Sequence, residues 1–340
     1  MNKNLKRWLL ALTIIVAVMG ICTLVLLNRT FEAELAARVN IPKDSSKESV
    51  RDSLESALGA ESGSLVYKLW SVAGGDVARA HGSYLVEPGT KLVEVAKNIA
   101  GGRQTPVSVT INNVRTLDQL TKLLSSKLEV SQSELKQALQ DRLGDRDDFG
   151  ATATFPAAVL PDTYEFYWTD TADHVVNKLV QTRDKFWNAD RLSKASKLGL
   201  TPVQVATIAS IVEEESNKKE ELPIIARLYI NRVHQGMKLQ ADPTVKFALG
   251  NFALRRITGK DLRVDSPYNT YKYAGLPPGP IRVPKASTID AVLNSPPNPY
   301  LFMCAKSDFS GYHDFAADAK THAANAKKYW AALNERKIYR

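Results

Sequence analysis

Three consecutive carboxylates, Glu213, Glu214 and Glu215, are the part of the sequence best suited to chemistry. They end a predicted helix over residues 201–216, in which apolar residues recur with the period of a half-buried helix. At about 100° per residue, Glu215 falls within about 20° of Ile208 on the apolar face, whereas the other two carboxylates fall well off it. A carboxylate on an apolar face is costly unless it is paired, protonated or functional.

Burial on this face predicts that the pKa of Glu215 is raised above its usual value of roughly 4.3. A carboxyl group that stays protonated at neutral pH is the general acid that cleavage of a glycosidic bond requires. The alternative is that Glu215 belongs to a solvated helix end or to a salt bridge. The helix by itself leaves both interpretations open.

The elements that would position Glu215 are also marked in the sequence. Thr201 and Gln204 form a capping box, and Pro202 suits the first helical position. A second helix is predicted from residue 223 to residue 236, where a glycine ends it. Residues 237–299 are rich in Pro, Gly, Asn and Tyr and are predicted to be irregular, and such a long loop-rich segment beside a candidate acid is typical of a functional region.

The remaining elements follow from periodicity and turn residues. The N-terminal part predicts a strand and a turn over 82–90, a helix up to Gly101, and an alternating strand over 107–111. Later in the chain, a long amphipathic helix is predicted over 173–192, two strands over 300–305 and 311–315, and a closing helix over 321–336.

A run of 20 uncharged residues, 8–27, is long enough to span a bilayer. Lys3, Lys6 and Arg7 precede it and predict that the N-terminus stays in the cytoplasm. We expect an uncleaved anchor in preference to a signal peptide, because no small-residue cleavage site follows closely. The helix is expected to continue as a stalk over residues 29–39.

Composition narrows the function further. The 340 residues suffice for two or three domains, and the net charge of +9 suits an anionic polymer or a membrane surface. No nucleotide or metal signature occurs, so we expect no metal and no cofactor. Of the five histidines, His313 and His322 are the two candidates for a functional role, but an ordinary polar structural role is the preferred interpretation of each.

The sequence from Ala209 to Glu215, ASIVEEE, resembles the signature of the YceG-like endolytic murein transglycosylases, the MltG family. The resemblance is good over residues 160–329, and residues 82–102 are similar to the segment that this family builds into a small LysM-like module. It continues through a series of ordered motifs at residues 161–164, 231–232, 236–237, 239–245, 266–271 and 275–281.

The resemblance implies non-hydrolytic cleavage of the MurNAc–GlcNAc β-1,4 bond inside peptidoglycan strands, with Glu215 as the catalytic residue. Glu214 stands where the family usually has Lys, and this extra negative charge is expected to raise the pKa of Glu215 further. Asp242 is the best second acid, with a turn residue before a proline as the alternative. Amide hydrogen bonding and aromatic stacking suit a polysaccharide groove, so the candidate sugar contacts are Gln240, Asp242, Tyr268, Asn269 and Tyr271.

Together these observations predict an α+β protein with an N-terminal membrane anchor, a small LysM-like α/β module, and a mainly helical catalytic domain with a loop-rich groove and short strands. The expected domains are a cytoplasmic tail (1–7), a transmembrane helix (8–28), a stalk with the LysM-like module (29–104) and the YceG-like catalytic domain (105–340).

The expected location is the inner (cytoplasmic) membrane, crossed once, with the catalytic domain on the periplasmic side. Expected partners are peptidoglycan strands and, as a further candidate, the cell-wall synthases. Two rival functions stay open, a two-carboxylate peptidoglycan hydrolase and a non-catalytic wall-binding scaffold. Binding to nucleic acid would suit the charge but not an exported domain.

Overall fold

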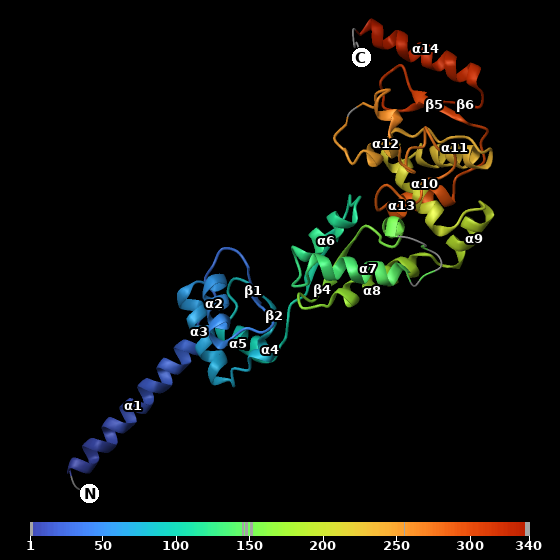
Figure 1. Cartoon of the computed structure of the whole chain (residues 1–340). Helices are drawn as coiled ribbons and strands as arrows, with labels where there is room; N and C mark the ends of the chain where they lie inside the picture. The colour runs from blue at the N-terminus through green and yellow to red at the C-terminus, as the bar shows by residue number, and fades with distance from the viewer. Residues whose placement is uncertain (1–2, 145, 147–148, 150–151, 255, 337–340) are drawn as a thin grey trace. The chain divides into compact units, whose positions relative to one another are not determined.

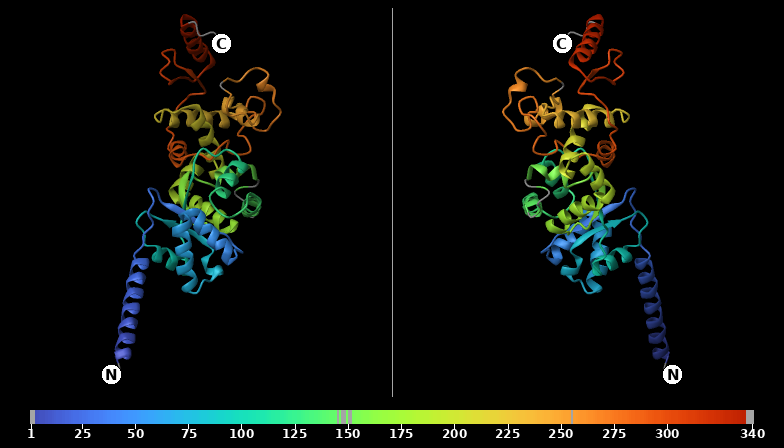
Figure 2. Two further views of the ribbon diagram at one scale, coloured as in Figure 1. Left: turned by 90° about the vertical axis from the view of Figure 1, so that its left-hand side faces the viewer. Right: turned by 90° about the vertical axis from the view of Figure 1, so that its right-hand side faces the viewer.

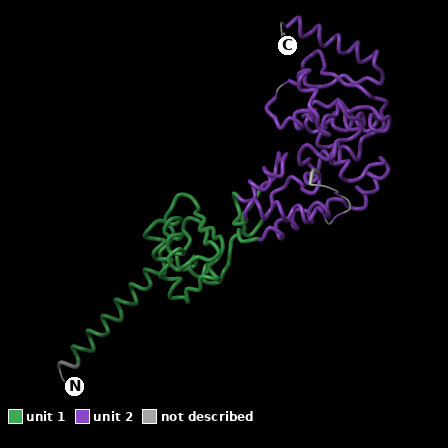
Figure 3. Tube along the Cα trace, in the orientation of Figure 1, with its two compact units in different colours: residues 1–109, 126–130, 165–170 green, residues 110–125, 131–164, 171–340 purple. Residues whose placement is uncertain are grey.

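The computed structural model describes residues 3–144, 146, 149, 152–254 and 256–336. Its contacts divide the chain into two compact units, green and purple in Figure 3. Unit 1 is residues 1–109, 126–130 and 165–170, and unit 2 is residues 110–125, 131–164 and 171–340. Parts of two predicted domains, residues 1–2 of the tail and 337–340 of the last domain, lie outside the described residues.

The first helix, α1 (Lys3–Leu27), has the length and composition of a membrane span (Figure 1). The most apolar 18-residue window between Lys6 and Leu27 has a mean hydropathy of 2.8, and none of that window is buried. The predicted stalk over residues 29–39 is wrong, because the chain leaves the helix and enters the core of unit 1. Phe31 is 5% exposed there, and its backbone N–H donates to the carbonyl of Thr90 at 2.8 Å.

The rest of unit 1 is a small α/β unit with its own apolar core. Strand β1 (Ala37–Ile41) pairs antiparallel with β2 (Gly82–Val86), which places Val39 opposite Tyr84. Trp70 is fully buried in the core. The helices of this unit are α2 (Lys47–Leu58), α3 (Ala60–Val72), α4 (Val77–Ala80) and α5 (Leu92–Ala100). The strand and helix predicted between residues 82 and 101 are confirmed as β2 and α5.

A second two-stranded sheet joins β3 (Val107–Ile111), also predicted, with β4 (Asp162–Phe166). The helix predicted over 173–192 is instead two helices. They divide because the side chain of Asn188 caps the second one, accepting a hydrogen bond from the Arg191 backbone N–H at 3.0 Å. The helical elements of this part are α6 (Leu117–Ser125), α7 (Gln132–Gly144), η1 (Thr152–Ala157), α8 (Ala172–Phe186) and α9 (Ala189–Lys197).

The core of unit 2 is built around α10 (Pro202–Glu215), which packs against α11 (Leu222–His234) and α13 (Ala286–Leu293) (Figure 1). The prediction that residues 237–299 are irregular is therefore partly wrong. Besides α13, this stretch holds α12 (Asp242–Ala248) and the short η2 (Asp261–Arg263). The apolar residues of α13 are buried on one face, and burial in the core of unit 2 stabilises a helix too short to be predicted from periodicity.

The last elements of unit 2 form a hairpin and a helix. Strands β5 (Phe302–Ala305) and β6 (His313–Ala316) pair antiparallel, and α14 (Ala319–Glu335) packs along them (Figure 2). All three were predicted. The fold class is thus a mixture of helices and short antiparallel strand pairs, as expected.

Candidate active site

Helix α10 carries Glu215 to the wall of a cavity. The helix starts at the predicted capping box, in which the Thr201 side chain accepts from the backbone N–H of Gln204 and the Gln204 side chain accepts in return. The eight residues from Val205 to Val212 are all buried, so the helix is held on all sides by the core. Glu215 is its last residue and lies where the helix leaves that core.

The cavity has a volume of about 350 Å³ and lies wholly within unit 2. Its wall is formed by the end of α10, the second half of α11, the start of α12, the β5–β6 hairpin and the start of α14, together with loop residues. The lining residues are Glu215, Leu228, Tyr229, Arg232, Leu239, Gln240, Asp242, Tyr271, Met303, Cys304, Ala305, His313 and His322.

One hydrogen bond holds the carboxyl group of Glu215, and several neighbouring groups shift its pKa. Tyr229 donates its hydroxyl to Glu215 Oε1 at 2.7 Å. Burial raises the pKa of Glu215 to about 7, and the nearby charge of Asp242 raises it as well, whereas the Tyr229 hydrogen bond lowers it. At neutral pH the protonated and ionised forms of this carboxyl group are therefore both populated, so it can donate a proton as well as accept one.

Tyr229→Phe tests how far the Tyr229 hydrogen bond lowers the pKa of Glu215. The variant loses the hydrogen bond that stabilises the carboxylate, so the pKa of Glu215 should rise above about 7. Titration of the side-chain carboxyl carbon by NMR measures the change, with the exposed Tyr167→Phe as the matched control. An unchanged or lowered pKa in Tyr229→Phe would contradict the assignment.

Asp242 lies at the first position of α12 and is exposed to the cavity. Its Oδ1 accepts a hydrogen bond from the hydroxyl of Tyr271 at 2.6 Å. Burial and the Asp242 carboxylate both raise the pKa of Tyr271, so the phenol keeps its proton. Asp242 and Tyr271 therefore form one polar patch on the cavity wall.

Gln240 reaches the cavity from a backbone conformation that is unusual for its residue type. Its φ is +50°, a left-handed value that costs energy in a residue other than Gly. The conformation is held from both sides, because the Gln240 backbone N–H donates to Thr270 O at 3.1 Å and the Ala241 backbone N–H donates to Thr270 Oγ1 at 3.0 Å. Strain of this kind is typical of functional sites.

Two of the predicted sugar contacts lie away from the cavity lining. The side-chain amide of Asn269 is buried and donates to the carbonyls of Leu262 and Val264, at 2.9 and 2.8 Å. Tyr268 packs on Phe247 with ring centroids 4.6 Å apart. Both side chains hold the loop that supplies Tyr271.

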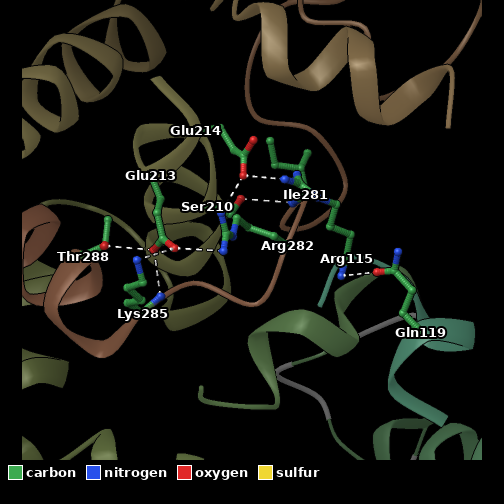
Figure 4. A network of polar contacts seen from close by, with 9 residues as sticks. All are labelled: Arg115, Gln119, Ser210, Glu213, Glu214, Ile281, Arg282, Lys285 and Thr288. Atoms are coloured by element: carbon green, nitrogen blue, oxygen red, sulfur yellow. Dashed lines mark hydrogen bonds and ion pairs between the residues drawn. The ribbon is translucent and has the colours of Figure 1, made fainter. Parts of the chain in front are cut away.

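The other two carboxylates of the triplet are paired with cations (Figure 4). Glu214 Oε1 lies 2.6 Å from Arg282 Nη1 and 2.8 Å from Arg115 Nη2. Glu213 lies 3.2 Å from Arg282 and accepts from Thr288 Oγ1 at 3.0 Å. Burial and the Asp242 carboxylate raise the pKa of Glu215, whereas Glu214 is paired with two guanidinium groups. The expectation that Glu214 raises this pKa further stays a prediction.

Several residues of the site were not identified as functional from the sequence. Tyr229 lies in the second predicted helix, and the sequence does not distinguish either Tyr229 or Glu221 as functional. His313 and His322 were noticed but interpreted as ordinary polar structure. Both line the cavity, and the Nδ1 of His322 is buried without a hydrogen-bond partner among the described residues.

The described residues hold no group of three or more His, Cys, Asp or Glu side chains placed to bind a metal ion. The polar groups of the cavity wall are carboxyl, phenol, amide and imidazole groups, together with the guanidinium group of Arg232 and the thiol of Cys304. Such a set suits proton transfer and the binding of hydroxyl-rich ligands.

Comparison with known sequences assigns the chain to a family. The sequence profile of the YceG-like family matches residues 39–328. The chain belongs to the YceG-like family.

Two relatives carry the same name. This YceG-like chain is 27% identical over 324 residues to the endolytic murein transglycosylase of Bacillus subtilis (strain 168), covering 90% of this chain and 88% of that protein. It is 32% identical over 162 residues to the endolytic murein transglycosylase of Streptococcus pneumoniae, but this match covers only 46% of the chain and 29% of that protein.

A solved structure supports the fold. The crystal structure of a yceG-like protein from Listeria monocytogenes superposes with a TM-score of 0.55 at 25% sequence identity, covering 86% of this chain and 99% of that one. The fold described above is therefore of a kind already observed in a crystal structure.

Proposed function

We propose that this YceG-like protein is a membrane-anchored endolytic lytic transglycosylase. It cleaves the MurNAc–GlcNAc β-1,4 bond inside peptidoglycan strands and leaves 1,6-anhydroMurNAc ends. One observation carries the proposal: a carboxyl group with a pKa of about 7, Glu215, stands on the wall of a polar cavity in a chain related to proteins named for this reaction.

In the proposed mechanism Glu215 is the general acid and base. Its protonated form gives a proton to the leaving glycosidic oxygen while positive charge develops at the anomeric carbon. The 6-hydroxyl of the same sugar then attacks that carbon, and the carboxylate helps to remove the hydroxyl proton. Water is not consumed, so a second carboxylate beside the bond is not needed.

The polar patch on the cavity wall is proposed to hold the sugar. Gln240 offers an amide donor and acceptor, and the Asp242–Tyr271 pair offers a carboxylate and a phenol. We propose these three as direct contacts. Tyr268 and Asn269, which lie outside the cavity lining, are proposed to act through the loop that carries Tyr271.

Helix α1 is proposed to anchor the protein in the cytoplasmic membrane, with the rest of the chain on the periplasmic side and residues 1–7 in the cytoplasm. The α/β part of unit 1, which contains most of residues 29–104, is proposed to serve as the LysM-like module. The catalytic domain is then residues 105–340. Cell-wall synthases working on the same strands are the proposed protein partners.

The pH dependence of cleavage follows from the pKa of Glu215. Because the acid must be protonated, kcat/KM should fall about tenfold per pH unit above pH 7, and Glu215 should contribute no loss below it. Initial rates on uncrosslinked strands measure the profile. A rate that stays constant from about pH 6 to pH 9 would show that Glu215 is not the acid.

Product analysis tests the function itself. Uncrosslinked strands are digested with the detergent-solubilised full chain, and the fragments are weighed by mass spectrometry. We expect 1,6-anhydro ends, one water lighter than the products of hydrolysis. Reducing ends would favour the two-carboxylate hydrolase with Asp242 as the second acid, and binding without any cleavage would favour the scaffold.

A further inference from the structure

His313 is fixed at the cavity wall by a buried carboxylate. It is the first residue of β6, and its backbone N–H donates to Glu221 Oε1 at 2.7 Å. Its ring nitrogen Nδ1 lies 3.0 Å from Glu221 Oε2. Glu221 is only 4% exposed, and its Oε2 also accepts from Ser216 Oγ at 3.1 Å. The imidazole is thus held through both its backbone and its ring.

This pairing decides which ring nitrogen carries the proton. An ionised carboxylate can only accept hydrogen bonds, so Nδ1 of His313 is the donor to Glu221. In the neutral ring Nε2 is then the acceptor, and it has no hydrogen-bond partner among the described residues. Because the ring lines the cavity and Glu221 holds its Nδ1 side, Nε2 is the nitrogen available to a molecule bound there.

The other titratable groups near Glu215 are less suited to accept a proton. Asp242 already accepts the hydroxyl of Tyr271. Burial raises the pKa of the Cys304 thiol, which favours its neutral, protonated form. His322 is stacked on an aromatic ring, with its buried Nδ1 unpartnered among the described residues, and no described carboxylate orients it. His313 is therefore the lining group that combines a fixed orientation with an accepting nitrogen.

We propose that His313 is a second catalytic residue of the transglycosylation, with Glu221 as its positioning residue. The inference rests on the proposed function and divides its proton transfers between two groups. Glu215 gives its proton to O4 as the C1–O4 bond breaks. The 6-hydroxyl oxygen forms the C1–O6 bond, and its proton passes to Nε2 of His313. The imidazolium then returns one proton to the Glu215 carboxylate inside the cavity, which restores both groups.

Chemical rescue tests this role. His313→Ala in the full-length chain should lower kcat at least about 100-fold with little change in KM, since general base catalysis contributes factors of this size. Added imidazole should restore part of the rate, because it can occupy the space of the missing ring. His313→Gln keeps a donor for Glu221 but accepts no proton at neutral pH, and it should be as slow as His313→Ala. The exposed His174→Ala is the matched control.

The positioning role of Glu221 has its own readout. In the His313→Ala background, Glu221→Gln should weaken the imidazole rescue, because the free imidazole loses the carboxylate that orients it. A purely structural Glu221 would lower the rate of the double variant without changing the ratio of rescued to unrescued rate, and that result would overturn its assignment.

The outcomes separate the two proposals. Anhydro products from the wild type, together with a His313→Ala or His313→Gln variant that keeps kcat within about threefold, would overturn the inference and leave the proposed function standing. A slow His313→Ala that imidazole does not restore would assign a structural role to His313 and overturn it equally. A wild type that forms no anhydro products would instead overturn the proposed function.

Discussion

Replacing Glu215 by Gln is expected to lower kcat for glycan cleavage by about 10³-fold, within the range that a general acid contributes. Gln has nearly the same shape as Glu and can still accept the Tyr229 hydrogen bond, but it has no proton to give. The fragments that carry 1,6-anhydro ends should disappear from the mass spectra, while binding of the strands is kept. A matched control is Glu220→Gln, an exposed carboxylate five residues further along the chain, which should cleave at the wild-type rate.

The same variant should gain stability, and the gain should depend on pH. The folded pKa of Glu215 is about 7 and its unperturbed value is 4.5, so the folded state holds this proton more tightly than the unfolded state. The free energy of unfolding of the wild type therefore falls by up to about 3 kcal/mol as pH rises from 4.5 through 7. The Gln variant does not share this loss. Urea unfolding at pH 4 and pH 8 measures the difference, and an equal difference at both values would contradict the raised pKa.

Arg282→Ala is expected to be the most destabilising single change near the site. Arg282 pairs with both Glu213, whose side chain is 7% exposed, and Glu214 (Figure 4). Without Arg282, Glu214 keeps Arg115 as a partner. Among the described cations, however, the buried carboxylate of Glu213 keeps only the exposed Lys285, 3.6 Å away. The loss of one partner from a buried ion pair costs about 3 kcal/mol. The loss should appear as a lower urea midpoint with an unchanged slope.

An exposed ion pair gives the contrast. Lys272→Ala removes a cation that pairs with Asp265 at the surface, with side chains 44% and 74% exposed, and should cost less than about 1 kcal/mol. The double variant Arg282→Ala/Glu213→Gln should recover part of the stability lost in Arg282→Ala, because the buried carboxylate left with only the exposed Lys285 is removed. Equal losses for Arg282→Ala and Lys272→Ala would show that the network does not stabilise the fold.

The sequence alone determined the elements that carry strong local signals. The apolar run of α1, the capping box of α10, and the alternating residues of β3 each express a local preference that needs no distant partner. The position of Glu215 on the apolar face of α10 follows from the helical period in the same way, and so does the raised pKa expected from it. Each of these expectations agrees with the structure.

The weaker local signals needed the tertiary structure. Helix α13 is only eight residues long and is stabilised by burial against α10 and α11. Its sequence lies between prolines and by itself predicts a loop. The stalk prediction failed for the opposite reason. The sequence of residues 29–39 is compatible with a helix, but Phe31 is buried in the core of unit 1 and Val39 pairs with Tyr84 in a strand.

Only the tertiary structure decided which charges Glu215 experiences. The sequence places Glu214 next to Glu215, but cations from residues 115 and 282, far away in the chain, neutralise Glu214 on another side of α10. The groups that do face Glu215 come from α11, from α12 and from the β5–β6 hairpin, at least 14 residues distant in sequence. Electrostatic interactions depend on distance in space and on burial, and the order of residues along the chain gives neither quantity.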